Sequence, residues 1–376
     1  MSRTRDEDAC PGALNVHQAA DGALARVRLP GGMITSAQLE ALAETTLQFA
    51  AGTLELTGRG NLQIRGITDT AAVAAAVAAA GLLPSSRHET VRNIVASPLS
   101  GRAGGLADIR PWVSALDRAI QDAPELAGLT GRFLFAIDDG TGDVSGLAAD
   151  AGVQVLDDGV ALLLAGRDAG VRLDHGEVIP TLISIARRFT QVRGNSWRIT
   201  ELDDPNALLD GLTRVDPTLA VTPVTRPPVG WIEQAATGSG VVPVTLGAAV
   251  PLGVLTARQA QFVAAINAPV VITPWRSLLV CDLDEGVADA SLRVLAPLGL
   301  VFDATSRWLD VTSCVGSPGC ERSRADVRAE AAKAATTGSG AGRVHYVGCE
   351  RACGKPVAGQ VLIATGTGYE PHPAQS

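Results

Sequence analysis

Hydrophobic and polar positions follow the same repeating order in two stretches of this chain. In the first stretch, apolar alternation predicts strands at 23–29, 53–57 and 62–67, and helical spacing of apolar residues predicts helices at 35–50 and 70–80. The resulting order is strand, helix, strand, strand, helix. This order is typical of a ferredoxin-like half.

The order returns after a Pro-, Thr- and Gly-rich linker at 221–240. The pattern there predicts strands at 241–246, 270–273 and 278–283 and helices at 256–266 and 286–295. Local sequence agrees as well, because TGRGN (57–61) and TPWRS (273–277) occupy the same turn of the two stretches. We therefore expect an α+β fold that is internally duplicated, with two ferredoxin-like halves.

A second α/β stretch follows each half. After the first half, the pattern predicts helices at 111–123 and 179–192 and strands at 131–137 and 159–165. After the second half, it predicts a helix at 321–336 and strands at 343–347 and 358–364. The predicted domains are a first half at 1–95, a first α/β unit at 96–220, a second half at 221–302 and a second α/β unit at 303–376.

Four cysteines near the end of the chain form two tight pairs, Cys314 with Cys320 and Cys349 with Cys353. Both pairs lie in runs rich in Gly and Pro, and four thiolates are the usual ligands of a 4Fe-4S cluster. The second α/β unit is therefore expected to carry an iron–sulfur cluster. Structural zinc is the first alternative, although C-x5-C spacing fits it less well. Inert thiols are the second.

The other two cysteines, Cys10 and Cys281, fall outside this pattern. Cys281 lies in the apolar run SLLVCDL and is interpreted as a core residue. Six cysteines in 376 residues are too few for a disulfide framework, and no secretory leader is evident.

Composition narrows the function classes further. The net charge of −8 argues against general binding to nucleic acid. Hydrophobic residues make up 46% of the chain, yet charges, Gly or Pro interrupt every apolar stretch before it reaches the length of a membrane span. We therefore expect a cytoplasmic protein that does not bind membranes.

Several motifs resemble a known group of enzymes. The turn LTGRGNLQIRG (56–66), the segment TVRNIVASP (90–98) and the two cysteine pairs resemble the nitrite and sulfite reductase superfamily. The runs ACPG (9–12), ADGALARVRLPGG (20–32) and GCERACG (348–354) resemble the precorrin-3B synthase family within it. The resemblance covers nearly the whole chain, although residues 140–240 add little.

This resemblance implies chemistry on a tetrapyrrole. The precorrin-3B synthase family are monooxygenases that use dioxygen to hydroxylate precorrin-3A at C20, with closure of a γ-lactone, in aerobic cobalamin biosynthesis. The reductases of the superfamily instead hold sirohaem, joined to the cluster through a cysteine that corresponds to Cys353. The alternative function is therefore a sirohaem-dependent ferredoxin–nitrite or sulfite reductase. A third hypothesis is a non-catalytic tetrapyrrole carrier.

The resemblance also points to residues that would meet the ring. Because the ring bears many carboxylates, arginines are suitable partners. The predicted substrate-binding residues are Arg59, Asn61, Arg65, Arg92, Asn93, Arg132 and Arg276. Three of these, Arg59, Arg92 and Arg132, match motifs that face the cofactor in the reductases and are predicted to be catalytic.

One departure separates the two branches. The reductases place two basic residues, spaced by two, on the strand that corresponds to 131–137. Here Arg132 fills the first position and Leu134 the second. Losing one cation weakens binding of a small anion, so the resemblance favours the hydroxylase.

The sequence shows no flavin or nicotinamide site. Electrons from NAD(P)H are therefore expected to arrive through a separate reductase or a ferredoxin. A cluster with four cysteine ligands has no open coordination site, so oxygen activation requires either an additional non-haem iron or exchange of one ligand.

Overall fold

The computed structural model describes the chain except residues 1–9, 237, 239, 339–341, 357 and 374–376. Ala9 of the ACPG run therefore lies outside the described residues. The chain divides into two compact units. Unit 1 comprises the described part of Met1–Gly12, Arg28–Gly32 and Leu83–Val224, and unit 2 comprises Ala13–Val27, Met33–Leu82 and the described part of Thr225–Ser376. None of the described helices is both long and apolar enough to span a membrane.

The first predicted half forms an antiparallel sheet in unit 2 with the strand order β1-β2-β5-β4-β13. Its strands are β1 His17–Ala19, β2 Gly22–Val27, β4 Thr53–Leu56, β5 Leu62–Ile67 and β13 Val254–Thr256, and its helices are α1 Ser36–Phe49 and α2 Thr70–Ala79. The three strands and two helices predicted for this half are confirmed. Because β1 and β13 are only three residues long, the pattern did not predict them.

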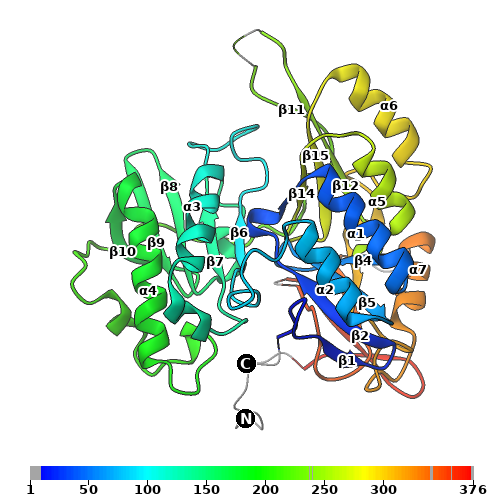
Figure 1. Cartoon of the computed structure of the whole chain (residues 1–376), viewed down its shortest axis with the longest axis horizontal. Helices are drawn as coiled ribbons and strands as arrows, with labels where there is room; N and C mark the ends of the chain where they lie inside the picture. The colour runs from blue at the N-terminus through cyan, green and yellow to red at the C-terminus, as the bar shows by residue number, and fades with distance from the viewer. Residues whose placement is uncertain (1–9, 237, 239, 339–341, 357, 374–376) are drawn as a thin grey trace. The chain divides into compact units, whose positions relative to one another are not determined.

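The second half forms an antiparallel sheet of the order β11-β12-β15-β14-β3, also in unit 2. Its strands are β11 Gly230–Glu233, β12 Val244–Ala249, β14 Val270–Ile272, β15 Ser277–Leu283 and β3 Met33–Ile34, and its helices are α5 Ala257–Ala264 and α6 Glu285–Leu295. Helices α1 and α5 pack side by side (Figure 1). The predicted linker at 221–240 contains the strand β11, which pairs with β12.

The two halves exchange their outer strands. Strand β13 follows β12 of the second half along the chain but pairs with β4, with Leu255 opposite Leu54. Strand β3 likewise leaves the first half and pairs with β14, with Ile34 opposite Val270. Each sheet is therefore completed by residues from the other half.

Matching caps start the first helix of each half. The Thr35 hydroxyl accepts a hydrogen bond from the N–H of Gln38, whose side chain accepts one from the N–H of Thr35. Thr256 and Gln259 form the same capping box before α5. Such reciprocal bonds satisfy backbone donors that a helix start would otherwise leave unpaired.

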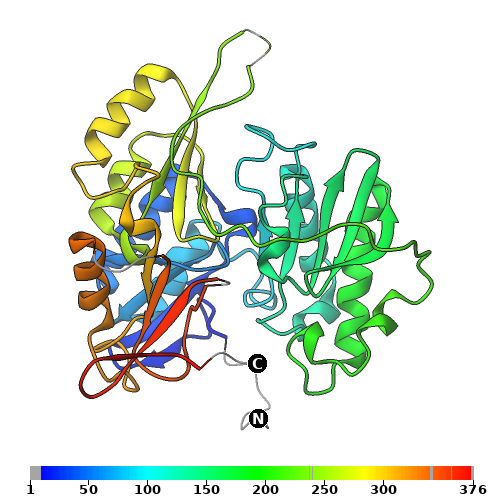
Figure 2. The ribbon, with the colours of Figure 1, turned by 180° about the vertical axis from the view of Figure 1, so that it is seen from behind.

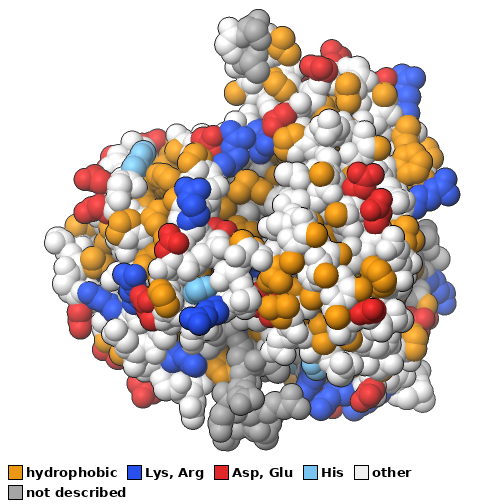
Figure 3. Space-filling model, in the orientation of Figure 1, with side chains coloured by type: hydrophobic (Ala, Val, Ile, Leu, Met, Phe, Trp, Pro, Cys, Tyr) orange, Lys and Arg blue, Asp and Glu red, His pale blue; other side chains and the backbone are white. Residues whose placement is uncertain are grey.

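Helix α2 packs through a narrow stripe. Val73 and Val77 are buried, and the remaining positions are mostly alanine. Small apolar side chains consequently lie on the surface over α2 (Figure 3). Its Ala-rich sequence favours the helix by propensity, with little contribution from a wide apolar face.

Unit 1 contains a sheet of the order β10-β9-β8-β7-β6 with helices α3 and α4. The strands are β6 Ile94–Ala96, β7 Phe135–Asp138, β8 Ala151–Leu156, β9 Gly159–Leu164 and β10 Arg167–Leu173, and the helices are α3 Arg110–Gln121 and α4 Val178–Val192. Strands β6, β7 and β8 are parallel. Packed rings of Phe133, Phe135 and Phe189 lie in the core, with centroids 5.0 and 5.1 Å apart.

One prediction in unit 1 is wrong in its bounds. The predicted strand 131–137 begins only at Phe135, so Arg132 and Leu134 lie in the segment before it. The backbone turns there, because the N–H of Phe133 donates to the carbonyl of Thr130 at 3.0 Å. The apolar residues after Arg132 are buried and therefore look like a strand in the sequence. Phe133 and Leu134 nevertheless belong to the turn before β7.

The second α/β unit lies in unit 2 and forms the sheet β16-β17-β18-β19, drawn in orange and red in Figure 2. Its elements are β16 Val311–Ser313, α7 Val327–Thr337, β17 Val344–Val347, β18 Gln360–Ala364 and β19 Tyr369–Pro371. The first three strands are parallel. The predicted helix 321–336 is wrong at its start, because the Asp326 side chain caps the N–H of Ala329 and the helix begins at Val327.

Candidate functional site

The four predicted ligand cysteines lie at one end of the β16–β17 pair. Cys314 directly follows β16, and Cys349 lies two residues after β17. Since these strands are parallel and adjacent, their carboxyl ends meet at the same edge of the sheet. Cys320 and Cys353 lie in the loops that continue from that edge, and none of the four is in a disulfide.

The Cys353 thiol is close enough to the other three cysteines to be influenced by their charges. The pKa of Cys353 is raised above its ordinary value, first by burial and then by the negative charges that Cys314, Cys349 and Cys320 would carry. The N–H of Gly348 donates to Cys314 Sγ at 3.4 Å. Among the described residues, no group of three or more His, Cys, Asp or Glu side chains could hold a metal ion.

Arg276 contacts a residue next to each cysteine pair. Its Nη1 donates to the carbonyl of Ser313 and its Nη2 to the carbonyl of Gly354, each at 3.2 Å. Ser313 precedes Cys314, and Gly354 follows Cys353. Burial lowers the pKa of Arg276 from its ordinary value, although a guanidinium stays charged throughout the physiological range.

His345 supports the second pair from within the sheet. It is fully buried on β17, with Nδ1 2.8 Å from Thr312 Oγ1 and Nε2 3.1 Å from the carbonyl oxygen of Cys353. Burial, and then the charge of Arg276, lower the pKa of His345 to about 4. The ring is therefore neutral near pH 7, and its Nε2–H donates to Cys353 while its Nδ1 accepts from Thr312.

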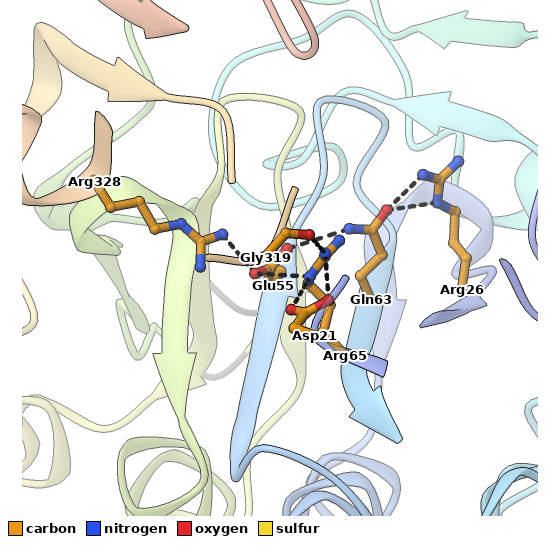
Figure 4. Close-up of polar contacts among 7 residues, drawn as sticks. All are labelled: Asp21, Arg26, Glu55, Gln63, Arg65, Gly319 and Arg328. Carbon is orange, nitrogen blue, oxygen red and sulfur yellow. Dashed lines mark hydrogen bonds and ion pairs between the residues drawn. The ribbon is translucent and has the colours of Figure 1, made fainter. Parts of the chain in front are cut away.

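Arg65 reaches the first pair from the other sheet. It lies on β5 with 9% of its side chain exposed, and its Nε and Nη2 donate to the two carboxylate oxygens of Asp21 at 3.0 and 2.8 Å (Figure 4). The same Nη2 donates to the carbonyl of Gly319 at 2.8 Å. Gly319 precedes Cys320, so this bond ties the first cysteine loop to the first half.

Glu55 continues this contact toward α7. Its carboxylate forms an ion pair with Arg328 of α7 and lies 3.9 Å from Arg65 Nε. Gln63 donates to Glu55 at 3.3 Å and accepts from Arg26 (Figure 4). These side chains alternate with buried residues such as Leu54 along the strands, so the first sheet has one apolar face and one polar face.

The turns 57–61 and 273–277 have the same backbone frame. In each turn the N–H of the first residue donates to the carbonyl of the last at 2.9 Å. The fourth residue of each, Gly60 and Arg276, has a left-handed backbone with φ of 66° and 58°. Arg276 thus occupies a conformation that glycine adopts more readily.

Arg59 and Asn61 lie in the first of these turns. The N–H groups of both donate to the hydroxyl of Thr57, at 3.3 and 3.1 Å. Asn61 is buried, whereas Arg59 is partly exposed. The turn thus fixes the backbone from which both side chains project.

The remaining predicted residues lie in unit 1. Arg92 forms a two-point ion pair with Asp117 of α3, at 2.6 and 2.9 Å. The Asn93 amide donates to the carbonyl of Gly131 at 3.0 Å and so holds the segment that carries Arg132. Arg132 is exposed and stacks over Trp197, with 4.7 Å from its Cζ to the ring centroid.

The structure therefore brings Arg65 and Arg276 to the cysteine loops, while Arg92, Asn93 and Arg132 gather near the start of β6 and β7. Sequence reasoning did not identify Asp21, Glu55 or Arg328, and it gave His345 no role. The alternation of polar residues along β4 and β5 was a usable signal. It marked a second, polar face of the sheet that required partners.

Comparisons with known proteins identify relatives in sequence and in fold. The family model for the nitrite/sulfite reductase ferredoxin-like half domain matches residues 17–80. Precorrin-3B synthase from Sinorhizobium sp is 26% identical over 380 residues, which cover 96% of this chain and 81% of that protein. The resemblance to precorrin-3B synthase is confirmed. Its near-complete coverage distinguishes it from the partial matches to the reductases.

Two of those partial matches are ferredoxin–nitrite reductases. The enzyme of Synechococcus elongatus is 36% identical over 31% of this chain and 25% of its own length. That of Leptolyngbya laminosa is 35% identical over 30% of this chain and 24% of its own. The solved structure of the Mycobacterium tuberculosis NirA protein covers 93% of this chain and 73% of its own, with a TM-score of 0.76 and 20% identity. At this identity, the structural likeness concerns the fold.

Proposed function

We propose that this chain is a precorrin-3B synthase, an oxidoreductase that hydroxylates precorrin-3A at C20 with dioxygen and forms a γ-lactone in cytoplasmic cobalamin biosynthesis. The observation that carries the proposal is similarity to precorrin-3B synthase along 96% of the chain. As a monooxygenase it would place one oxygen atom in the product and release the other as water. The two electrons required would come from NAD(P)H through a separate reductase or ferredoxin.

The second α/β unit is proposed to hold a 4Fe-4S cluster through Cys314, Cys320, Cys349 and Cys353. Four thiols on two loops at one sheet edge match the donor set of such a cluster, and the N–H bond to Cys314 is of the kind that stabilises a thiolate. The C-x5-C spacing of the first pair fits structural zinc less well. When bound, the cluster would relay electrons.

The proposed substrate contacts are charge-assisted hydrogen bonds from arginines to ring carboxylates. Arg59 and Arg132 are the leading candidates, because both are accessible and both start from a fixed backbone segment. Asn61, Arg92 and Asn93 hold those segments or lie beside them and are proposed to orient the contacts. Arg92 is also proposed to be catalytic, through its match to the reductase motif. No residue is assigned to an additional non-haem iron.

We also propose that the two ferredoxin-like halves arose by duplication and that the chain has the four domains expected from the sequence. The matched caps, the matched turns and the exchanged strands support a duplication of one ferredoxin-like half. The four domain boundaries inferred from the sequence remain predictions.

The second candidate is a sirohaem-dependent nitrite or sulfite reductase, with Cys353 joining the cluster to sirohaem. It is favoured by the identity of 36% to a ferredoxin–nitrite reductase over 126 residues. The apolar Leu134 opposes it, because this side chain cannot bind an anionic substrate or deliver a proton. Leu134 is also buried.

The decisive experiment supplies anaerobically purified protein with precorrin-3A, NAD(P)H, a reductase and isotopically labelled dioxygen. We expect a lactone product that has gained one labelled oxygen atom, detected by mass spectrometry. The same preparation should not reduce sulfite or nitrite with reduced methyl viologen. Reduction of either anion, together with extractable sirohaem, would establish the second candidate. Tight binding of precorrin-3A without turnover would instead support the non-catalytic tetrapyrrole carrier.

A further inference from the structure

Two arginines, one from each half, bind backbone carbonyls beside the cysteines. Arg65 of β5 binds the carbonyl before Cys320, and Arg276, just before β15, binds the carbonyls of Ser313 and Gly354. Between them they reach the loops of both cysteine pairs. Both residues were predicted from motifs to bind substrate.

The Arg65 contact is closely fitted. A Cβ at Gly319 would lie 3.0 Å from Asp21 Oδ2 and 2.8 Å from Val315 Cγ2, so the loop packs directly on the Arg65–Asp21 pair. The pair is a two-point, charge-assisted interaction with restricted geometry. Moving the Gly319 carbonyl would therefore leave a buried guanidinium N–H without its acceptor, which is costly.

The charges around Arg65 also favour an internal role. Asp21 and Glu55 both lie within ion-pair distance of its guanidinium, at 2.8 and 3.9 Å. An anionic substrate would have to compete with two carboxylates already in place. Arg65 is therefore better suited to hold protein groups than to recruit a carboxylate ligand.

We propose that Arg65 and Arg276 are positioning residues that fix the two cysteine loops for the iron–sulfur cluster. This inference rests on the proposed function, which supplies the cluster. Each ferredoxin-like half contributes one arginine, so the cluster site depends on both halves as well as on the cysteine unit. Neither residue needs to touch the substrate to affect turnover.

The test compares wild type, Arg65→Met and Arg65→Lys after anaerobic purification. The readouts are iron and sulfide per chain, the electron paramagnetic resonance spectrum after reduction, and the rate of bleaching in air. Loss of an outer-shell partner typically lowers metal affinity about 10–100-fold, so Arg65→Met should contain less cluster, bleach faster and show an altered spectrum. Arg65→Lys keeps the charge but lacks the planar fork that makes the two-point pair with Asp21, and should be intermediate.

The matched control is Arg172→Met. Arg172 forms the same two-point pair with Asp168, at 2.9 and 2.9 Å, but its partners Asp168, Val171 and Thr218 all lie in unit 1. Its iron content and spectrum should match wild type. A second variant, Arg276→Gly, suits the left-handed backbone and removes the contacts to Ser313 and Gly354. It should change the same readouts as Arg65→Met even if the latter folds poorly.

The outcomes are distinguishable from failure of the proposed function. If wild type binds the cluster and Arg65→Met and Arg276→Gly keep its content, spectrum and bleaching rate, the positioning role is wrong. A weaker affinity for precorrin-3A in those variants would then restore the substrate-binding prediction. If wild type contains neither iron nor sulfide, both the cluster and the positioning role are overturned. Cluster effects in a protein that does not hydroxylate precorrin-3A would uphold positioning and reject the activity.

Discussion

Carboxylates at the end of β7 and in the loop that follows it show how individual residues set the stability of unit 1. The Asp138 carboxylate accepts from the N–H groups of Gly140, Gly142, Val144 and Ser145 and from the Ser145 hydroxyl. This anion is thus well satisfied by the loop that surrounds it. Asp143, by contrast, accepts from the Ser97 hydroxyl at 2.6 Å and lies near Asp138 and Asp139.

This arrangement predicts a pH-dependent stability. Burial, aided by the like charges of Asp138 and Asp139, raises the pKa of Asp143 to about 7. The folded state therefore holds a proton that the unfolded chain releases near pH 4. Stability should fall as pH rises from about 4 to about 7, by at most about 4 kcal/mol. Asp143→Asn should remove this decline and be more stable than wild type at pH 8.

Urea unfolding at pH 5 and pH 8 measures the effect. The control is the exposed Asp203→Asn, which should follow wild type at both values. An equal change in wild type and Asp143→Asn between the two pH values would contradict the prediction.

Spacing predicted two cysteine pairs, and the structure places Cys314 and Cys349 at the same edge of one sheet, with Cys320 and Cys353 in the loops that continue from it. Their common iron–sulfur centre stays a prediction. The partners of the arginines could not be predicted in this way. Arg65 lies 44 residues from Asp21 and 254 from Gly319, so its partners depend on tertiary packing. Arg276 was predicted from a turn motif, yet its left-handed backbone shows only in the structure.

At the scale of elements, the capping boxes connect each helix start to the helix that follows it in the same half. The Gln38 amide also donates to the carbonyl of Ala80 after α2, at 3.1 Å. Gln259 donates in the same way to Leu298 after α6, at 2.8 Å. One side chain therefore serves both the cap and the packing of the second helix.

Removing the cap hydroxyl tests this feature. Thr35→Ala and Thr256→Ala should each lower the free energy of unfolding by about 1 kcal/mol, because an N–H at the helix start loses its acceptor. Thr35→Ser and Thr256→Ser retain the hydroxyl and should lie close to wild type. Denaturant titration followed by circular dichroism would measure these differences. If the serine variants lose as much free energy of unfolding as the alanine variants, the threonine methyl group, and not the capping hydroxyl, provides the stability.

Long, periodic elements were predictable, whereas short ones were not. The helices α1, α3 and α4 have enough turns for apolar spacing to identify them. Strand β3 has two residues and pairs with a strand 236 positions away, so no local pattern marks it. Residues 321–326 form part of the cysteine loop and not of a helix. Backbone hydrogen bonds fix them there, including one from the N–H of Arg324 to the carbonyl of Gly348.

At the scale of the whole molecule, the exchanged outer strands make the two halves depend on each other. Without β13, strand β4 would be an exposed edge with unpaired backbone groups, and such edges promote aggregation. We therefore predict that a fragment of residues 13–82 is unfolded or aggregated when produced alone. A version with 250–256 attached through a flexible linker should be more soluble and more ordered.

Heteronuclear NMR spectra and light scattering would measure this difference. A control fragment with the attached segment scrambled should behave like the fragment alone. Dispersed amide signals from a monomeric 13–82 fragment would show that the first half folds without β13 from the second half.

The exchange also sets an order of events on the ribosome. Strand β4 ends at Leu56 and its partner β13 ends at Thr256, so 200 residues must be added before the pair can close. At synthesis rates of about 5–20 residues per second, the nascent edge of β4 waits about 10–40 s. During that interval the nascent chain offers a binding site to chaperones that recognise extended backbone. Synonymous codons that slow translation between these strands would lengthen the exposure without changing the protein.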